Sequence, residues 1–384
     1  MSEIVILGSG LSGMISALSF ANFGIKTTII ERTDLSCNNI HDHNDVRTTA
    51  LNPRSQAFLD QINAWQDLYQ YISPISDIYV LDNKTSPILH FPNNDSGYLG
   101  YIISNHDFKN ELLNQVQKNE LITIIDNTTY NEVDPYTNTL HLSNNNVIHY
   151  DLLVVCDGIY SKIKHRYFTK KINKPYNQHA LTFHIEHEKD HEGSAVEHFL
   201  PSGPFAILPM LQKNKSSVVW TVKSCDAPLL VDLPKDRFEY LIQQNFGPFL
   251  GRIKLASTIA QFPLRAYVAD QYYFQNIALV ADSAHIVHPL AGQGLNQGIN
   301  DIDCLTRLVS SEKCMISESL LRSYELDRKD DNLAMYYITD NVNRLFSNNS
   351  SILKHLRRFG LFALENCNPL KQQLIRYASG GSRK

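Results

Sequence analysis

A glycine-rich segment near the N-terminus constrains the fold more than any other feature of this chain. Gly8-Ser9-Gly10-Leu11-Ser12-Gly13 follows directly on the apolar run Ile4-Val5-Ile6-Leu7. A continuous apolar run is typical of a strand buried on both faces of a parallel sheet. Helically spaced apolar residues then continue to about Gly24, and Thr27 to Ile30 is β-branched again. The pattern predicts one βαβ unit with the glycines in its first turn.

Each glycine of this turn has its own reason in a dinucleotide-binding site. Gly8 allows a tight turn, Gly10 lets the backbone approach a pyrophosphate, and Gly13 permits close packing of helix on strand. The N–H groups of the helix N-terminus suit phosphates. Glu31 closes the second strand, where its carboxylate would accept a ribose hydroxyl and repel a 2′-phosphate. We therefore predict Gly8, Gly10, Gly13 and Glu31 as cofactor-binding residues; the alternative is a turn in an unrelated α/β protein.

Composition excludes several classes of protein. With 43% hydrophobic and 19% charged residues, the 384-residue chain is neither disordered nor a disulfide-dense miniprotein. Its formal net charge of −4 offers nucleic acid no general attraction, so no nucleic-acid partner is expected.

Six scattered cysteines predict free thiols in a reducing cytoplasm. The chain starts without a basic signal-peptide region and holds no apolar run long enough to span a bilayer. His41, Asp42 and His43 lack further ligands, so we expect no metal site.

Further patterns predict a discontinuous nucleotide-binding domain. Leu152 to Cys156 and Ile277 to Ala281 are again continuous apolar runs. Residues 76–100 and 179–265 carry short β-rich runs separated by Pro, Gly and Asn, which predict an antiparallel sheet, and helical spacing follows residue 318. We predict a mixed α/β (α+β) fold in which a Rossmann-like domain is interleaved with an antiparallel-sheet substrate domain. The first takes residues 1–72, 100–175 and 266–317, the second takes 73–99 and 176–265, and 318–384 form C-terminal helices.

Three separated segments together resemble one known family. They are the N-terminal glycine turn, the segment Cys156 to Ser161, and the segment Ala281 to Asp301. The set resembles the FAD-dependent aromatic-ring monooxygenases of the p-hydroxybenzoate hydroxylase fold. His288-Pro289-Leu290-Ala291-Gly292-Gln293-Gly294 is similar to the signature of the ubiquinone-biosynthesis hydroxylases. The resemblance covers nearly the whole chain and implies FAD as the cofactor.

The resemblance also implies further cofactor-binding residues. Arg47 would lie near the FAD diphosphate, Asn105 at the ribityl chain and Asp157 beside the cofactor, whereas a solvent-facing arginine, a helix start and a turn aspartate are the alternatives. Asp282, at a strand end, would accept hydrogen bonds from ribityl hydroxyls. The loop that would approach the isoalloxazine ring comprises Pro289, Gly292, Gln293, Gly294 and Asn296.

The late segment also has a physical rationale as a flavin cradle. Its glycines allow close backbone approach, with a sharp loop as the alternative. The N-terminus of a helix predicted from Asn296 to Val309 would stabilise negative charge on the reduced flavin. Two residues depart from the family pattern. Lys164 replaces an arginine and loses bidentate phosphate geometry, which weakens the expectation of NAD(P)H docking. Ala281 replaces a glycine, a change that FAD binding should survive.

The implied activity is hydroxylation of a polyprenylated phenol in ubiquinone biosynthesis. Its chemistry would be carried by FAD and O2 through a C4a-hydroperoxyflavin, with electrons from NAD(P)H or a protein donor. Other ubiquinone-biosynthesis proteins are candidate partners, and no catalytic protein residue is identified. A hydroxylase of a small soluble phenol and a non-catalytic flavoprotein subunit are the alternatives. The Trp-x-Trp element of flavin halogenases is absent, because the two tryptophans are Trp65 and Trp220.

Two segments predict weak contact with the inner face of an anionic membrane. Lys162 to Lys174 holds six Lys/Arg in thirteen residues, and Leu353 to Phe362 mixes apolar residues with Lys354, Arg357 and Arg358. The alternative is an apolar stripe packed on its own domain beside solvated charges. A substrate that must be collected from the bilayer favours the first interpretation.

Overall fold

Apolar and β-branched runs form a six-stranded sheet in the computed structural model, which describes residues 3–35, 45–82, 89–93, 97–312, 315–347 and 365. The strand order is β19-β20-β12-β1-β2-β8, and all neighbouring pairs are parallel except β19 with β20. The strands are β1 (Ile4–Leu7), β2 (Thr27–Ile30), β8 (Ile122–Ile125), β12 (Leu152–Val155), β19 (Tyr273–Phe274) and β20 (Ile277–Leu279). β1 and β12 are buried on both faces, as their continuous apolar runs require.

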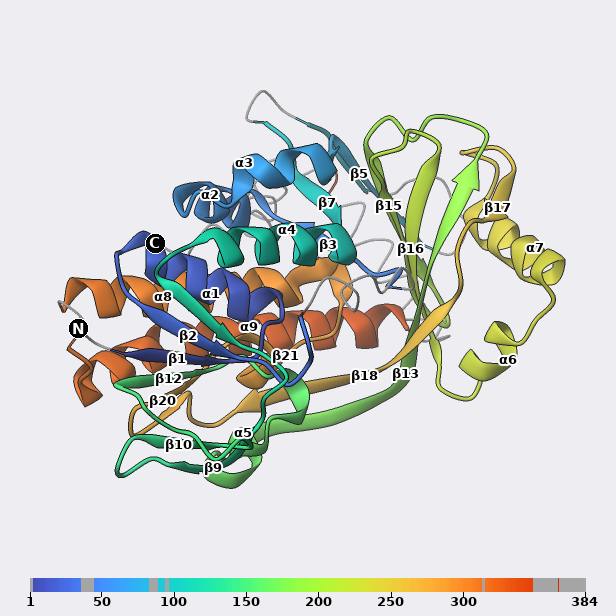
Figure 1. Cartoon of the computed structure of the whole chain (residues 1–384). Coiled ribbons are helices and arrows are strands. Elements are labelled where there is room, and N and C mark those ends of the chain that lie inside the picture. Colours follow the sequence, from blue (N-terminus) through green and yellow to red (C-terminus); the bar gives the residue numbers. More distant parts are fainter. Residues whose placement is uncertain are drawn as a thin grey trace.

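Helices cover one face of this sheet, and a small sheet covers the other (Figure 1). α1 contacts both α4 and α8, and α8 contacts α9. These helices are α1 (Leu11–Asn22), α4 (Asn105–Lys118), α8 (Gln293–Ser311) and α9 (Glu318–Phe346). The small antiparallel sheet comprises β9 (Tyr130–Asp134), β10 (Thr139–Leu142) and β11 (Val147–His149). In the described part of the chain, no helix is long and apolar enough to cross a membrane.

A short antiparallel sheet connects the nucleotide-binding half to the second half of the molecule. It consists of β3 (Thr48–Leu51), β4 (Ile72–Ile75) and β7 (Gly100–Ser104), with β7 in the centre. Short helices accompany it: α2 (Pro53–Gln61), α3 (Trp65–Leu68) and the 3-10 turn η1 (Tyr69–Tyr71). The Asn52 side chain caps α2 by accepting a hydrogen bond from the Ser55 N–H.

The second half is built on a large sheet with the order β21-β18-β13-β16-β15-β14-β5-β6, to which β17 adds beside β13. Neighbours are antiparallel except β5 and β14, which are parallel. The strands are β5 (Asp77–Asp82), β6 (Leu89–Phe91), β13 (Lys170–His187), β14 (Ser194–Leu200), β15 (Gly203–Pro209), β16 (Lys215–Lys223), β17 (Ile253–Leu255), β18 (Ala260–Ala269) and β21 (His285–Ile286).

One face of the large sheet packs against α6 (Ala227–Val231) and α7 (Lys235–Phe246). Phe183 and Trp220 of the sheet pack against Phe238 of α7 in this core, and Phe205 packs against Trp220. The opposite face therefore turns toward the nucleotide-binding half, where β3 and α9 contact it.

The predicted fold class is confirmed, and several predicted elements differ only at their ends. The predicted helix from Asn296 to Val309 runs from Gln293 to Ser311. The predicted strand from Ile277 to Ala281 ends at Leu279, because Ala281 adopts a left-handed backbone with φ of 55°. The domain boundaries stay predictions; those at 175/176 and 265/266 fall inside β13 and β18. His41 to His43 and Leu353 to Phe362 lie outside the described residues.

Candidate functional site

Four predicted cofactor-binding residues lie at one edge of the six-stranded sheet. Gly8, Glu31, Asp157 and Asp282 follow β1, β2, β12 and β20, which are neighbouring parallel strands. The carboxyl ends of parallel strands meet at the same edge, and open α/β sheets bind ligands there. The structure therefore brings together residues that are far apart in the sequence.

The glycine turn has the geometry that a pyrophosphate requires. Gly8 has a φ of 94°, and a Cβ there would lie 3.0 Å from the Cys156 carbonyl oxygen. A Cβ on Gly13 would lie 1.9 Å from the Gly8 carbonyl oxygen, which excludes any side chain. A Cβ on Gly10 would meet nothing within 4 Å. Packing thus explains Gly8 and Gly13, while Gly10 faces open space where a ligand can approach.

Two helices begin at the site without side-chain caps. Gly10 precedes α1, and Gly292, with a φ of 61°, precedes α8. Neither helix carries a side-chain cap bond or an acidic residue in its first turn. Their first-turn N–H groups and partial positive charge are therefore directed at whatever occupies the site, which suits phosphate and a negatively charged flavin ring.

Glu31 is buried and engaged by its own neighbours. Its Oε2 accepts hydrogen bonds from the Ser9 N–H (2.7 Å) and hydroxyl (2.8 Å), and its Oε1 accepts from the N–H and hydroxyl of Thr33. Burial raises the pKa of Glu31, but these four bonds outweigh it and hold that pKa below its usual value. Since a carboxylate has about four acceptor positions, a ribose hydroxyl would replace one of the side-chain donors.

Arg47 and Asn105 lie side by side at the start of β3 and α4. The Asn105 N–H donates to the Arg47 carbonyl (3.0 Å), and its side-chain oxygen accepts from the Thr49 hydroxyl (2.6 Å). The Arg47 guanidinium makes a bidentate pair with Asp45 at 2.7 and 2.6 Å. Its half-exposed side chain remains close enough to Asp282 to offset part of the burial effect that raises the pKa of that carboxyl.

The signature loop lies against β3. It forms the 3-10 turn η4 (Leu290–Gly292) and then the start of α8 at Gln293. A Cβ on Gly292 would lie 2.9 Å from the Ala50 Cβ, whereas a Cβ on Gly294 would meet nothing within 4 Å. Gly292 is therefore required by packing, and Gly294 leaves room for a ligand. Pro289, just before the turn, is exposed.

Asn296 uses its whole side chain to hold this loop. Its Oδ1 accepts from the Asn52 N–H (3.0 Å) and the Ser55 hydroxyl (2.7 Å). Its amide nitrogen donates to the carbonyls of Ala50 (2.8 Å) and Gly292 (3.0 Å). All four bonds are made within the protein, so the side chain positions the loop, and only its backbone is available to a cofactor.

Lys164 interacts with two carboxylates, Asp157 just before the 3-10 turn η2 (Gly158–Tyr160) and Asp282 in the 3-10 turn η3 (Ala281–Ser283). The Lys164 side chain, on α5 (Lys162–Tyr167), is buried and lies 4.3 Å from the Tyr267 ring centroid. Burial lowers the pKa of Lys164 to about 8, although Asp157 and Asp282 oppose the shift. This lysine is therefore a residue of the protein interior, which does not suit docking of a second nucleotide.

Asp157 and Asp282 both have environments that favour contact with a ligand. Asp157 Oδ1 is buried without a hydrogen-bond partner among the described residues, and burial raises its pKa. Asp282 is exposed to solvent, yet the surrounding protein raises its pKa against the opposing charges of His285, Lys164 and Arg47. A carboxylate that is exposed and also surrounded by protein lies in a concave site. Both observations fit FAD, whose hydroxyls supply hydrogen-bond donors.

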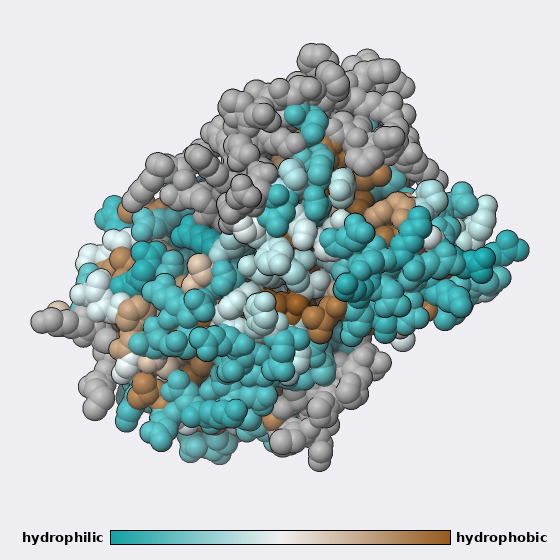
Figure 2. Space-filling model, turned by 90° about the horizontal axis from the view of Figure 1, so that it is seen from above, coloured by the Kyte–Doolittle hydropathy of each residue, from teal (hydrophilic) through white to brown (hydrophobic). Residues whose placement is uncertain are grey.

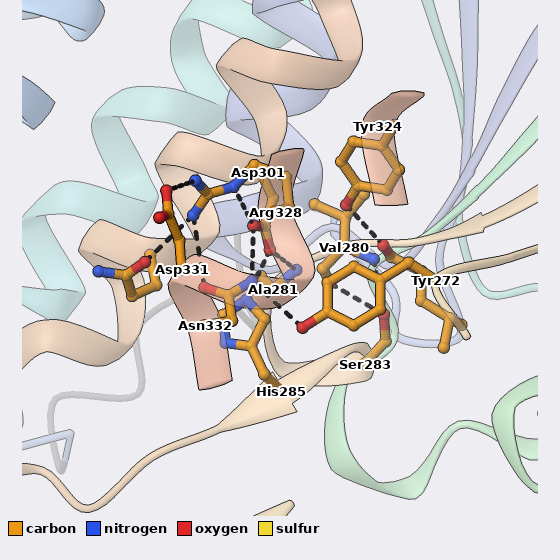
Figure 3. Close-up of polar contacts among 12 residues, drawn as sticks. Tyr272, Val280, Ala281, Ser283, His285, Asp301, Tyr324, Arg328, Asp331 and Asn332 are labelled. Carbon is orange, nitrogen blue, oxygen red and sulfur yellow. Dashed lines mark hydrogen bonds and ion pairs between the residues drawn. The ribbon is translucent and has the colours of Figure 1, made fainter. Parts of the chain in front are cut away.

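A buried ionic network fixes η3, the turn that carries Asp282 (Figure 3). Fully buried Asp301 of α8 accepts from His285 Nε2 (2.5 Å), Arg328 Nε (2.9 Å) and the Ala281 N–H (3.1 Å). Burial raises the pKa of Asp301, but His285 and Arg328 outweigh it and lower that pKa to about 2. The bond to Asp301 also holds Ala281 in its left-handed conformation, where glycine would be unstrained. The network therefore sets the position of Asp282.

Sequence reasoning missed Ser9, Arg328 and the role of Asp301 in this network. Ser9 lies inside the glycine turn. The predicted βαβ unit brings this turn close to the end of the second strand, so a hydrogen bond between the Ser9 hydroxyl and Glu31 could have been predicted. Arg328 stands among many charged residues of α9, and no local feature distinguishes it from solvent-facing arginines. Within the described ranges, no group of three or more His, Cys, Asp or Glu side chains forms a metal site.

The FAD-binding-domain family matches residues 1–336 of the chain. Ubiquinone hydroxylase UbiL of Rhodospirillum rubrum is 34% identical over 99% of the chain and 90% of that protein. The 3-demethoxyubiquinol 3-hydroxylase of Escherichia coli is 28% identical, with 99% and 98% covered. Among solved structures, p-nitrophenol 4-monooxygenase PnpA from Pseudomonas putida superposes with a TM-score of 0.81 at 14% identity, over the full length of both chains. Klebsiella pneumoniae HpxO complexed with FAD and uric acid gives a TM-score of 0.75 at 12% identity, with 99% and 96% covered.

Fold, site and relatives define an FAD-dependent aromatic-ring monooxygenase. The resemblance inferred from the glycine turn and the signature loop is thereby confirmed. Within that class, the chain belongs to the ubiquinone-biosynthesis FAD-dependent hydroxylases.

Proposed function

We propose that this enzyme hydroxylates the aromatic ring of a polyprenylated phenol in ubiquinone biosynthesis. The observation that carries the proposal is the 34% identity, over nearly the whole of both chains, to a protein named as a ubiquinone hydroxylase. When bound, FAD supplies the electrons that activate O2 for insertion into the ring. The protein has to bind and orient both partners and exclude water.

We propose specific roles for the residues at the carboxyl edge of the sheet. The α1 N-terminus and Gly10 would hold the diphosphate, with Gly8 and Gly13 shaping the turn, and Glu31 would hold the adenosine ribose. Arg47 and Asn105 would lie along the cofactor beside Asp157, and Asp282 would bind ribityl hydroxyls. The loop from Pro289 through Gly292, Gln293 and Gly294 would support the ring, positioned by Asn296.

The reductant is either NAD(P)H or a protein donor, and the burial of Lys164 favours a protein donor. Burial of Lys164 removes from the surface the cation that stands where the family carries an arginine. A nicotinamide nucleotide would need another cation for its phosphates. Consumption of NADH and NADPH by purified holoenzyme, with substrate present, distinguishes the two donors.

We further propose peripheral contact with a membrane surface. Four of the six basic residues between Lys162 and Lys174 are exposed. Lys164 is buried and Lys174 pairs with Asp340, so the expected charge of this segment is reduced. The face seen from above in Figure 2, which lies away from α5 at the lower side of Figure 1, is mainly hydrophilic, with hydrophobic residues in separate patches. Electrostatic attraction by the remaining four basic residues, without deep insertion, is the form of contact that the segment from Lys162 to Lys174 supports.

The decisive test is mass-spectrometric profiling of quinone intermediates in a deletion strain. We expect the strain to accumulate a prenylated phenol that lacks one ring oxygen. Wild-type protein should restore the product and Asp282→Ala should not, while Glu186→Gln, an exposed substitution remote from the sheet edge, serves as the control. Full complementation by Asp282→Ala would support a non-catalytic subunit. Hydroxylation of short soluble phenols alone, with unchanged quinone intermediates, would support the small-phenol alternative.

A further inference from the structure

Glu197 occupies an unusual position in the centre of the large sheet. Along β14, Val196 and Leu200 face the core beneath α7, so the alternate residues Ala195 and Phe199 face the other way. Glu197 lies midway between Ala195 and Phe199 and shares their face. This is the face that turns toward the nucleotide-binding half.

The neighbours of Glu197 on this face connect it to the signature loop, Phe199 directly and Ala195 through Ala50. Ala195 belongs to an apolar cluster with Ala50, the residue against which Gly292 packs. Phe199 clusters with Leu290 and stacks on Phe346 of α9, with a ring-centroid distance of 3.9 Å. Glu197 is therefore directed at the space beside η4, where the isoalloxazine ring of the proposed cofactor site would lie.

The residues across the sheet from Glu197 are small and uncharged. The strand register places Val80 of β5 and Ala206 of β15 beside it, and Val219 of β16 beside Ala206. Ala206 and Val219 are partly exposed although they lie on interior strands of the sheet. Solvent therefore reaches this row, and Glu197 places a carboxylate within it.

Glu197 lacks the partners that a buried carboxylate normally has. Its Oε1 is buried and has no hydrogen-bond partner in the described part of the chain. Burial alone raises the pKa of Glu197 to about 7. Asp82 of β5 and His184 of β13 share this face, and Asp340 and Arg344 of α9 pair with each other, but none of these groups contributes to the shift. Such a group titrates near neutral pH, as a general base requires.

We propose that Glu197 binds the hydroxyl of the phenol substrate and accepts its proton. The proton moves from the phenol oxygen to a carboxylate oxygen of Glu197, and the O–H electron pair stays on the phenol oxygen. The phenolate formed is richer in electrons at its ortho and para carbons, where an electrophilic oxygen attacks. This inference rests on the proposed function, because it requires a phenol in the site.

A binding experiment on the FAD-loaded protein tests the contact without turnover. The probes are 2-prenylphenol and its O-methyl ether, titrated at pH 8 while flavin absorbance is recorded. We expect wild type and Glu186→Gln to prefer the phenol by about tenfold or more, because a charge-assisted hydrogen bond is lost with the ether. Glu197→Ala should bind both probes within threefold of each other. A preference retained in Glu197→Ala would overturn the assignment, whereas wild type that binds neither probe would overturn the proposed function as well.

Dependence on substrate acidity tests the proton transfer itself. We expect Glu197→Gln to keep its FAD, with a thermal midpoint at pH 6 no lower than that of wild type, but to hydroxylate 2-prenylphenol about a hundredfold more slowly at pH 7.5. Ring-fluorinated 2-prenylphenols, which ionise without help, should recover most of that loss. The wild-type rate should level off above pH 7, while the variant rate keeps rising as the phenol itself ionises. Equal loss for acidic and ordinary phenols would show a structural role and overturn the proposal.

Discussion

Two glutamates show how neighbouring atoms decide what one residue type does. Glu31 and Glu197 are both largely removed from solvent. Glu31 receives four hydrogen bonds from Ser9 and Thr33, so it stays ionised and holds a turn. Glu197 receives none from the described residues and is easily protonated. The first environment suits binding of hydroxyl groups, and the second suits proton transfer.

Glu31→Arg should weaken FAD binding by about tenfold or more, because the ribose loses a charged hydrogen-bond acceptor. Flavin absorbance after desalting, and identification of the released flavin, measure the effect. Glu120→Arg, an exposed substitution at the other end of the same sheet, is the control. The released flavin should be FAD in every case; FMN alone, or full FAD occupancy in Glu31→Arg, would contradict the assignment.

Glu197→Gln should change stability in a manner that depends on pH. The folded-state pKa of Glu197 is about 7, above its ordinary 4.5, so folding favours the protonated acid. Its contribution to stability is complete below pH 4.5 and is lost as the pH rises through 7. Gln mimics the protonated form, so the variant should match wild type at pH 4.5 and exceed it by about 1–3 kcal/mol at pH 8. Urea unfolding at both pH values measures this, and equal differences at both would refute it.

At the scale of elements, α9 stabilises the turn that carries Asp282. Arg328 reaches from α9 to Asp301 of α8, which in turn binds the turn at Ala281. Asp282 is thus positioned by two helices that it does not belong to. The long helix α9, which carries many charged residues, therefore helps to position Asp282 at the end of β20.

Arg328→Met should destabilise the fold by about 3–5 kcal/mol, because it leaves the buried carboxylate of Asp301 short of a partner. Arg322→Met, at an exposed position on the same helix, should have little effect. The double variant Asp301→Asn with Arg328→Met should recover part of the loss. Urea unfolding of the three variants provides the comparison, and equal losses for the two arginines would contradict the role of the network.

Periodicity and glycine spacing predicted those elements whose residues lie close together in the sequence. β1, α1 and β2 follow from periodicity and glycine spacing within thirty residues, and Gly8 and Glu31 follow from the same unit. Arg328 could not be predicted, because its partner lies 27 residues away on another helix. Glu197 left a signal in its strand, since a charge between Ala195 and Phe199 breaks an apolar face. The importance of that signal depends on which half of the molecule the face meets, and this only the tertiary structure determines.

At the scale of the whole molecule, charge is distributed unevenly. The net charge is −4, yet Lys162, Arg166, Lys170 and Lys171 are exposed along one short segment. Arg166 pairs with Glu132 at 3.7 Å, but both side chains are well exposed and such a pair is weak. The segment thus keeps a local positive field despite global repulsion from anionic surfaces.

Reversing two of these charges tests their role at a membrane. Lys170→Glu with Lys171→Glu should weaken binding to anionic vesicles more than about tenfold, since each basic residue near the surface contributes about 1 kcal/mol. Lys26→Glu with Lys118→Glu, two exposed lysines elsewhere, is the matched control. Flotation with vesicles of neutral and anionic lipid, in low and high salt, measures the binding. Equal recovery on both lipids would leave the segment an ordinary surface.

β13 and β18 run without interruption from the side of the six-stranded sheet into the large sheet (Figure 1). Their hydrogen-bond ladder has a register shift between Pro175 and His179, but it resumes on both sides. Tyr267 and Ala269 of β18 pack in the core around the six-stranded sheet, while Phe183 of β13 packs in the core beneath α7, so this strand pair joins the two cores. Melting should therefore be cooperative, with a single calorimetric transition for both halves, and no fragment cut within β13 should retain a native core.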